Sequence, residues 1–201
     1  MTIYLMSDTH FQHAVASKLR GFDTPEAHDV TIIKNAQKVV GKNDELFILG
    51  DVTFNANGAG FRENLKLLDQ IPGTKHLIVG NHDRCAPNNS NGFRYKKDFL
   101  KHFDSVSEMV TLSCDGIKFL LSHYPYDTSD DRFQYAASNV DMYDAFKPKD
   151  AGMPLIHGHT HTKYILTLSK NYTPQVNVNM ESIKMKPIAL KEIAAIVKPI
   201  V

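Results

Sequence analysis

The sequence has almost no net charge, few cysteines and no long hydrophobic run. Its 23 lysine and arginine residues balance 22 aspartate and glutamate residues, and a net charge of +1 gives no overall attraction to nucleic acid or to an acidic membrane surface. Two cysteines are too few for a disulfide framework; counting leaves one bridge open, but free thiols in a reducing cytoplasm are favoured. The apolar stretch IYLM (3–6) is far shorter than a signal-peptide core or a membrane-spanning helix. We therefore expect a cytoplasmic protein without a membrane partner.

The chain also lacks internal repeats, low-complexity tracts and any linker rich in proline, glycine or serine. With 201 residues, of which 42% are hydrophobic, it is long enough to bury one sizeable core. We expect a single domain over residues 1–201.

Short apolar runs and amphipathic segments alternate along the chain, which is typical of an α/β protein whose sheets are covered by helices. Segment 24–41 predicts a helix with Thr24 as N-cap and Pro25 at its first position, and segment 61–71 predicts a second one. A terminal helix is expected over 189–197. The runs with the length and branching of buried strands are IYLM (3–6), LFILG (46–50), LIVG (77–80), FLLS (119–122) and PLIH (154–157).

Each of these runs ends directly in polar residues that can bind a metal. Ligands collect outside the carboxyl ends of strands in open α/β sheets, so residues that follow several strands can meet at one point. Each piece alone is more often a cap or a surface pair, and it is their joint order that indicates a metal site. A mixed shell of oxygen and nitrogen favours Mn, Fe, Zn, Ni or Co over Ca or Mg. The runs are followed by Ser7-Asp8-Thr9-His10, Gly50-Asp51, Gly80-Asn81-His82-Asp83, His123 and His157-Gly158-His159-Thr160-His161.

In this order the motifs resemble those of the calcineurin-like metallophosphoesterases, and most closely the small bacterial and phage-type members. The family pattern is D-x-H, GD, GNHD, a lone H and GHxH. It matches residues 8–10, 50–51, 80–83, 123 and 158–161 of this chain. The resemblance implies an α/β fold with two mixed β-sheets packed as a sandwich and flanked by helices, with two metal ions at one edge.

The resemblance also implies ligand roles and an activity. One ion would take Asp8, His10 and His161, the other Asn81, His123 and His159, and Asp51 would bridge both. The protein would then be a metal-dependent phosphoesterase that hydrolyses phosphomonoesters or phosphodiesters by in-line attack of a metal-bridging hydroxide. We expect two divalent ions as cofactors, with Mn the ion that supports activity in vitro.

Residues beside the ligands are candidates for catalysis and substrate binding. His82 would assist the leaving group, with Asp83 holding its imidazole in one tautomer; a structural histidine is the alternative. Arg84 could meet a phosphate bidentately or form a surface ion pair, and His13 could touch the substrate or be an ordinary loop histidine. Segments 85–95 and 124–139 could form a rim or lid that sets substrate preference, or pack on themselves.

Two other functions remain as alternatives. A nuclease would use the same core on DNA or RNA, but the residues after the last ligand leave little room for added nucleic-acid-binding elements. The basic and aromatic segment 93–103 resembles a nucleic-acid stripe, yet the spacing of Phe93, Lys97 and Leu100 favours an amphipathic helix. A non-catalytic scaffold of the same fold would have lost ligands, and none is missing here.

Overall fold

The first sheet takes four strands from residues 3–107 and one edge strand from residues 188–189. The computed structural model describes residues 1–54, 60–126 and 143–201, and all statements on the fold refer to these residues. The strand order is β10-β1-β2-β3-β4. Strands β1 to β4 run parallel to one another, and the edge strand β10 is antiparallel to β1. The strands are β1 (Ile3–Met6), β2 (Glu45–Ile48), β3 (Thr74–Ile78), β4 (Ser105–Ser107) and β10 (Ile188–Ala189).

A second sheet of the described chain contains parallel strands in its centre and antiparallel strands at both edges. Its order is β5-β6-β7-β9-β8, with β6, β7 and β9 parallel to one another. Both sheets are therefore mixed, which confirms the predicted fold class, and each of the five apolar runs overlaps a strand. The strands are β5 (Met109–Cys114), β6 (Ile117–Ser122), β7 (Leu155–His157), β8 (Leu166–Leu168) and β9 (Pro174–Asn177).

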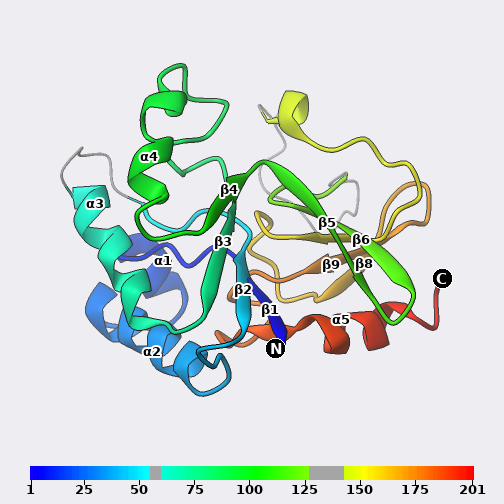
Figure 1. Cartoon of the computed structure of the whole chain (residues 1–201), viewed down its shortest axis with the longest axis horizontal. Helices are drawn as coiled ribbons and strands as arrows, with labels where there is room; N and C mark the ends of the chain where they lie inside the picture. Colours follow the sequence, from blue (N-terminus) through cyan, green and yellow to red (C-terminus); the bar gives the residue numbers. More distant parts are fainter. Residues whose placement is uncertain (55–59, 127–142) are drawn as a thin grey trace.

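The helices flank the sheets (Figure 1). Helices α1 to α4 lie on one side of the first sheet and the second sheet lies on its other side, while α5 runs along the bottom of the view and contacts β1, β10 and β5. None of the described helices is long and apolar enough to cross a membrane. The helical elements are α1 (Ala14–Leu19), α2 (Pro25–Gln37), α3 (Gly60–Leu65), α4 (Lys96–Phe99), α5 (Leu190–Val197) and the 3-10 turns η1 (Lys66–Gln70), η2 (Gly92–Arg94) and η4 (Asp144–Phe146).

Helix α2 begins where the sequence predicts. The hydroxyl of Thr24 accepts a hydrogen bond from the backbone N–H of Ala27 at 3.2 Å, and Pro25 occupies the first turn, where its missing N–H costs nothing. Ile32 and Ala36 are fully buried against the first sheet. The N-cap and the apolar face are thus local properties that the chain keeps after folding.

The helix predicted in segment 93–103 is shorter than expected, since the structure has the 3-10 turn η2 and the one-turn helix α4 there. Phe93 and Leu100 are 74% and 49% exposed, whereas Phe99 and Phe103 are buried. The ring of Phe99 lies 6.0 Å from that of Phe61 on α3. The segment is therefore amphipathic, and this contact between helices decides which of its aromatic residues face inward.

Candidate metal centre

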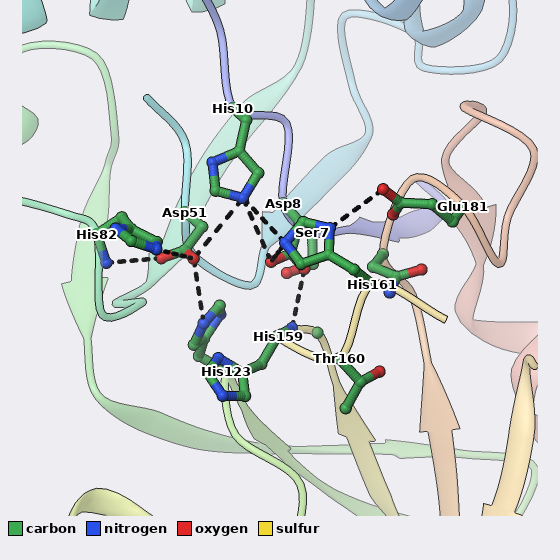
Figure 2. Close-up of polar contacts among 12 residues, drawn as sticks. Ser7, Asp8, His10, Asp51, His82, His123, His159, Thr160, His161 and Glu181 are labelled. Atoms are coloured by element: carbon green, nitrogen blue, oxygen red, sulfur yellow. Dashed lines mark hydrogen bonds and ion pairs between the residues drawn. The ribbon is translucent and has the colours of Figure 1, made fainter. Parts of the chain in front are cut away.

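The polar residues that follow β1 and β7 form a first cluster of possible metal ligands (Figure 2). The Nε2 atom of His161 lies 3.6 Å from Oδ1 of Asp8, and Nε2 of His10 lies 3.9 Å from the same oxygen. The two Nε2 atoms are themselves 3.2 Å apart. Residues 151 positions apart in the chain thus offer one carboxylate and two imidazoles to a common point.

A second cluster combines residues that follow β2, β3, β6 and β7. Nε2 of His123 lies 3.5 Å from Oδ2 of Asp51 and 2.9 Å from Oδ1 of Asn81. The same amide oxygen lies 3.0 Å from Nδ1 of His159. Nδ1 of His123 contacts the carbonyl oxygen of Leu49 at 2.7 Å, so it carries the proton and leaves Nε2 to face the cluster.

The two clusters adjoin through their carboxylates. Oδ2 of Asp51 also lies 3.9 Å from Nε2 of His10, and Asp8 has ligand atoms close to both groups. The backbone N–H of His159 donates to Oδ2 of Asp8 at 3.0 Å. All seven residues predicted from the sequence as ligands are therefore brought together at one edge of the two sheets.

A left-handed backbone turns these side chains toward one another. The φ angle is positive at Asp8 (59°), His10 (46°), Asp51 (53°), His159 (68°) and His161 (49°). Non-glycine residues rarely adopt this region, and such conformations persist where the surrounding structure enforces them and often where function needs them. The strained residues here are candidate ligands, which indicates that the turns serve the site.

Two glycines allow the turns to approach closely. Gly50 has φ +86°, and a Cβ atom there would lie 2.5 Å from the backbone of Gly80. A Cβ atom at Gly158 would overlap the side chains of Ser7 and Asp8. The glycines of the GD and GHTH motifs are thus required by close packing.

The electrostatics of the metal-free site fit a bound cation. Burial, followed by the charge of Asp8, raises the pKa of Asp51 well above its usual value, and burial together with neighbouring cations lowers the pKa of His10. Oδ1 of Asp8 is buried without a hydrogen-bond partner among the described residues. A divalent cation would neutralise the buried carboxylates and engage that oxygen, so the residues fit such an ion.

His82 lies at the edge of this site. Its backbone N–H donates to Oδ1 of Asp51 at 2.9 Å, and its Nε2 lies 4.0 Å from Oδ2 of the same carboxylate. Burial, followed by the charge of His123, lowers the pKa of His82 to about 4. The imidazole is therefore neutral at pH 7 in the metal-free protein.

Asp83 has other partners than the sequence predicted. Its carboxylate accepts hydrogen bonds from the backbone N–H groups of Asp51 (3.1 Å), Val52 (3.1 Å) and Gly80 (2.8 Å). Within the described part of the chain, no hydrogen bond joins Asp83 to the imidazole of His82. The correction has a physical reason, because a buried carboxylate binds the unpaired N–H groups where β2 and β3 end. Asp83 fixes the loops that carry the ligands.

The two predicted substrate-binding residues differ in their surroundings. The guanidinium of Arg84 lies 5.1 Å from the ring of Phe61 and 5.4 Å from that of Tyr95, in a cation–π arrangement beside α3 and α4. The ring of His13 lies 5.5 Å from that of His10 and stacks on Phe54 at 4.0 Å. His13 therefore borders the metal centre, whereas Arg84 packs on aromatic rings.

Of the two segments predicted as a rim, segment 85–95 is described throughout and segment 124–139 only in part. Tyr124 and Tyr126 are buried, and the ring of Tyr124 lies 5.1 Å from that of His159. Tyr124 therefore packs against a candidate ligand, while the hydroxyl of Tyr126 donates to the carbonyl oxygen of Met153 at 2.8 Å. Residues 127–142, which include most of segment 124–139, lie outside the described residues.

Sequence reasoning missed two polar residues behind the ligands. Glu181 accepts a hydrogen bond from Nδ1 of His161 at 3.1 Å, and Nε of Arg20 donates to the same carboxylate at 2.8 Å (Figure 2 shows Glu181 and His161). Glu181 lies in the stretch VNVNMES, which supports the family resemblance and whose alternation predicts a strand, but the motifs assign no role to Glu181. Arg20 stands in no motif, so only the fold reveals it.

Comparison with known proteins agrees with these features. A family model described as the calcineurin-like phosphoesterase superfamily domain matches residues 1–186. The Gene 66 proteins of Mycobacterium phages L5 and D29 are 34% and 31% identical to this chain; the matches cover 82% and 90% of it, and 79% and 88% of those proteins. The crystal structure of a protein of unknown function, AQ665 from Aquifex aeolicus, is 26% identical, with a TM-score of 0.66 over 97% of this chain and 98% of that one.

Proposed function

Because the chain belongs to the calcineurin-like phosphoesterase superfamily, we propose that it hydrolyses phosphate esters with two divalent metal ions held between its sheets. The observation that carries the proposal is the convergence of the Asp8 and Asp51 carboxylates with the imidazoles of His10, His123 and His161, which come from the ends of four strands; each imidazole lies within 4 Å of a carboxylate oxygen. Oδ2 of Asp51 faces both clusters, which supports a bridging role for this carboxylate. We assign Asp8, His10 and His161 to one ion, and Asn81, His123 and His159 to the other.

The chemistry supplied by the ions is the usual one for paired metals. Two divalent ions neutralise charge on the phosphate oxygens and lower the pKa of a water for in-line attack. The donors suit Mn, Fe, Zn, Ni or Co, and Mn is the ion that we propose for assays.

The chain itself then has to assist the leaving group, and we assign this task to His82. A neutral imidazole can donate one hydrogen bond to a phosphate or leaving-group oxygen. The negative charge of a bound ester would raise the pKa of the imidazole toward neutral pH, where the protonated ring can act as a general acid. The 4.0 Å separation from Asp51 places His82 next to the bridging carboxylate. Asp83 assists indirectly, because it fixes the backbone of the loops that carry Asp51 and Asn81.

The surroundings of His82 indicate where the leaving group lies. The ring of Phe54 is 38% exposed, stacks on His13 at 4.0 Å and meets the ring of His82 edge-on at 4.8 Å. A leaving group that receives a hydrogen bond from His82 would contact this phenyl ring. We therefore propose that Phe54 and His13 form one wall of the leaving-group site.

A metal and ester panel tests the function. The chelated protein should hydrolyse neither mono- nor bis-nitrophenyl phosphate, and Mn²⁺ should restore hydrolysis of at least one of them; an Asp51→Ala variant should stay inactive at any Mn²⁺ concentration. Cleavage of a labelled oligonucleotide in preference to these small esters would favour the nuclease alternative. A fully metallated protein that leaves every ester intact would support the scaffold alternative and contradict the proposal.

A further inference from the structure

Arg20 and Glu181 form a buried ion pair directly behind one cluster of candidate ligands. Their side chains are only 4% and 18% exposed, and Nε of Arg20 donates to Oε1 of Glu181 at 2.8 Å. Arg20 directly follows α1 and Glu181 follows β9, 161 residues further along the chain. Burial of two charges is costly unless both are paired and hydrogen-bonded, so the pair has to be explained by what else it contacts.

Glu181 fixes the orientation of His161. An ionised carboxylate can only accept hydrogen bonds, so the 3.1 Å contact places the proton of the imidazole on Nδ1. Nε2 is then left to face Oδ1 of Asp8 at 3.6 Å. A carboxylate that holds the second nitrogen of a ligand histidine fixes both the tautomer and the direction of the ring.

Arg20 fixes the backbone that carries the other two ligands of the same cluster. Its Nη2 donates to the carbonyl oxygen of Asp8 at 2.8 Å, and its Nη1 donates to that of Thr9 at 3.3 Å. Asp8 and His10, on either side of this contact, both have a left-handed backbone. The guanidinium thus binds a strained turn that would otherwise relax toward ordinary φ values.

A further contact holds the guanidinium itself in place. Nη1 of Arg20 lies 2.9 Å from Nε2 of His28, whose Nδ1 donates to the carboxylate of Asp29 at 2.8 Å. Nε2 of this tautomer accepts a hydrogen bond from Arg20. The planar fork of an arginine is matched to four acceptors at once, which a lysine ammonium cannot reproduce.

We propose that Arg20 and Glu181 are positioning residues for one of the two metal ions, the one assigned to Asp8, His10 and His161. In the described part of the chain, the hydrogen bonds of the pair reach the Asp8–Thr9 backbone and His161, and none reaches Asn81, His123 or His159. Loss of the pair should therefore lower the affinity for one ion and leave the affinity for the other unchanged. This inference rests on the proposed two-ion site and adds a selective effect that the site alone does not require.

Mn²⁺ titration of the metal-free full chain tests the proposal without any enzyme assay. Calorimetry gives stoichiometry and affinity, and electron paramagnetic resonance separates a spin-coupled pair of Mn²⁺ ions from a single ion. We expect two coupled ions in the unmodified chain. In Glu181→Ala one ion should bind with unchanged affinity and the other about 10- to 100-fold more weakly. At low Mn²⁺ concentration the resonance spectrum of this variant should therefore show a single, uncoupled ion.

Conservative variants and matched controls separate positioning from loss of folding. Glu181→Gln keeps an acceptor for His161 and should lose less affinity than Glu181→Ala; Arg20→Lys keeps the charge, loses the fork and should also weaken one ion. The matched controls are Glu63→Gln and Arg62→Lys, which make the same substitutions in two more exposed ion pairs of α3. Both control proteins should bind both ions with unchanged affinity. In a His161→Ala background, which already lacks the ligand that Glu181 orients, Glu181→Ala can act only through Arg20 and the Asp8–Thr9 turn, and it should cause a smaller further loss than in the unmodified chain.

The outcomes distinguish this inference from the proposed function. Equal binding of both ions by Glu181→Ala, or an equal loss of both, overturns the positioning role while the two-ion site stands. A further loss on top of His161→Ala that is as large as the loss in the unmodified chain also overturns it. An unmodified chain that binds fewer than two ions overturns the proposed function, and the positioning role with it.

Discussion

The carboxylate of Asp83 holds the backbone N–H of Asp51 at 3.1 Å and so ties the loop after β3 to the bridging candidate after β2. Two further backbone N–H groups, those of Val52 and Gly80, donate to the same carboxylate, which is buried. Asp83 therefore connects two ligand-bearing loops before any metal binds.

Replacement of Asp83 should destabilise the protein more than it alters catalytic protonation. Asp83→Ala leaves three buried N–H groups without an acceptor, and each unsatisfied group costs about 1–3 kcal/mol, so we expect a loss of at least about 3 kcal/mol. Urea unfolding of the metal-free protein measures it. If Asp83 instead served His82 as a tautomer-fixing partner, Asp83→Ala would lower turnover while the free energy of unfolding stayed unchanged.

His82→Ala should separate catalysis from metal binding. Its imidazole is not among the proposed ligands, so both ions should bind as before, while turnover falls by about 100- to 10,000-fold. The loss should be greatest for alkyl phosphate esters, whose leaving groups need the most assistance, and smallest for nitrophenyl esters. Parallel metal analysis and ester kinetics check this; near-normal hydrolysis of an alkyl ester would exclude His82 from the reaction.

Phe54→Ala should change substrate preference. Removal of the exposed ring beside His82 and His13 should raise KM for nitrophenyl esters several-fold, with little change for methyl esters, because only the former cover the ring. Phe93→Ala, at an exposed ring on η2, is the matched control. Equal KM changes for aryl and methyl esters would argue against a leaving-group wall.

The stability of the metal-free protein should depend on Glu181 in a defined pH range. Burial alone would raise its pKa, but the hydrogen bond from His161 and the charge of Arg20 outweigh this and lower it to about 2, against about 4.5 for an unperturbed glutamate. The unfolded chain thus binds more protons between these values, so the stabilisation is present above pH 4.5 and is lost as the pH falls toward 2. The difference in unfolding free energy between the unmodified chain and Glu181→Gln should reach at most about 3 kcal/mol at pH 6 and shrink below pH 4. A difference that is constant with pH would mean that the charge of Glu181 contributes nothing.

Gly158→Ala should damage the metal site through a steric clash. The added methyl group overlaps Asp8, so the carboxylate must move and Mn²⁺ affinity should fall at least tenfold, as measured by calorimetry. Gly21→Ala is the control, since its φ of +83° makes alanine strained although nothing lies within 4 Å. Equal Mn²⁺ affinities in the two variants would contradict the clash.

The sequence by itself determined the five strands whose ends carry the candidate ligands, the start of α2 and the set of candidate ligands. Apolar runs that end in carboxylates, imidazoles and an amide are local patterns, and Thr24 caps its helix through a contact three residues away. The parallel course of β1, β2 and β3 then makes the ends of these strands meet, which is why a linear order of motifs could predict a common site.

Only the tertiary structure decided the contacts between residues that no local pattern relates. The apolar face of segment 93–103 depended on Phe61, and the partners of Asp83 depended on which N–H groups the ends of β2 and β3 left unpaired. Arg20 and Glu181 form an ion pair although they lie 161 residues apart in the sequence. The residues next to each of them give no indication of this contact. Side-chain type and spacing describe what a residue can do, whereas packing selects the partner with which it does so.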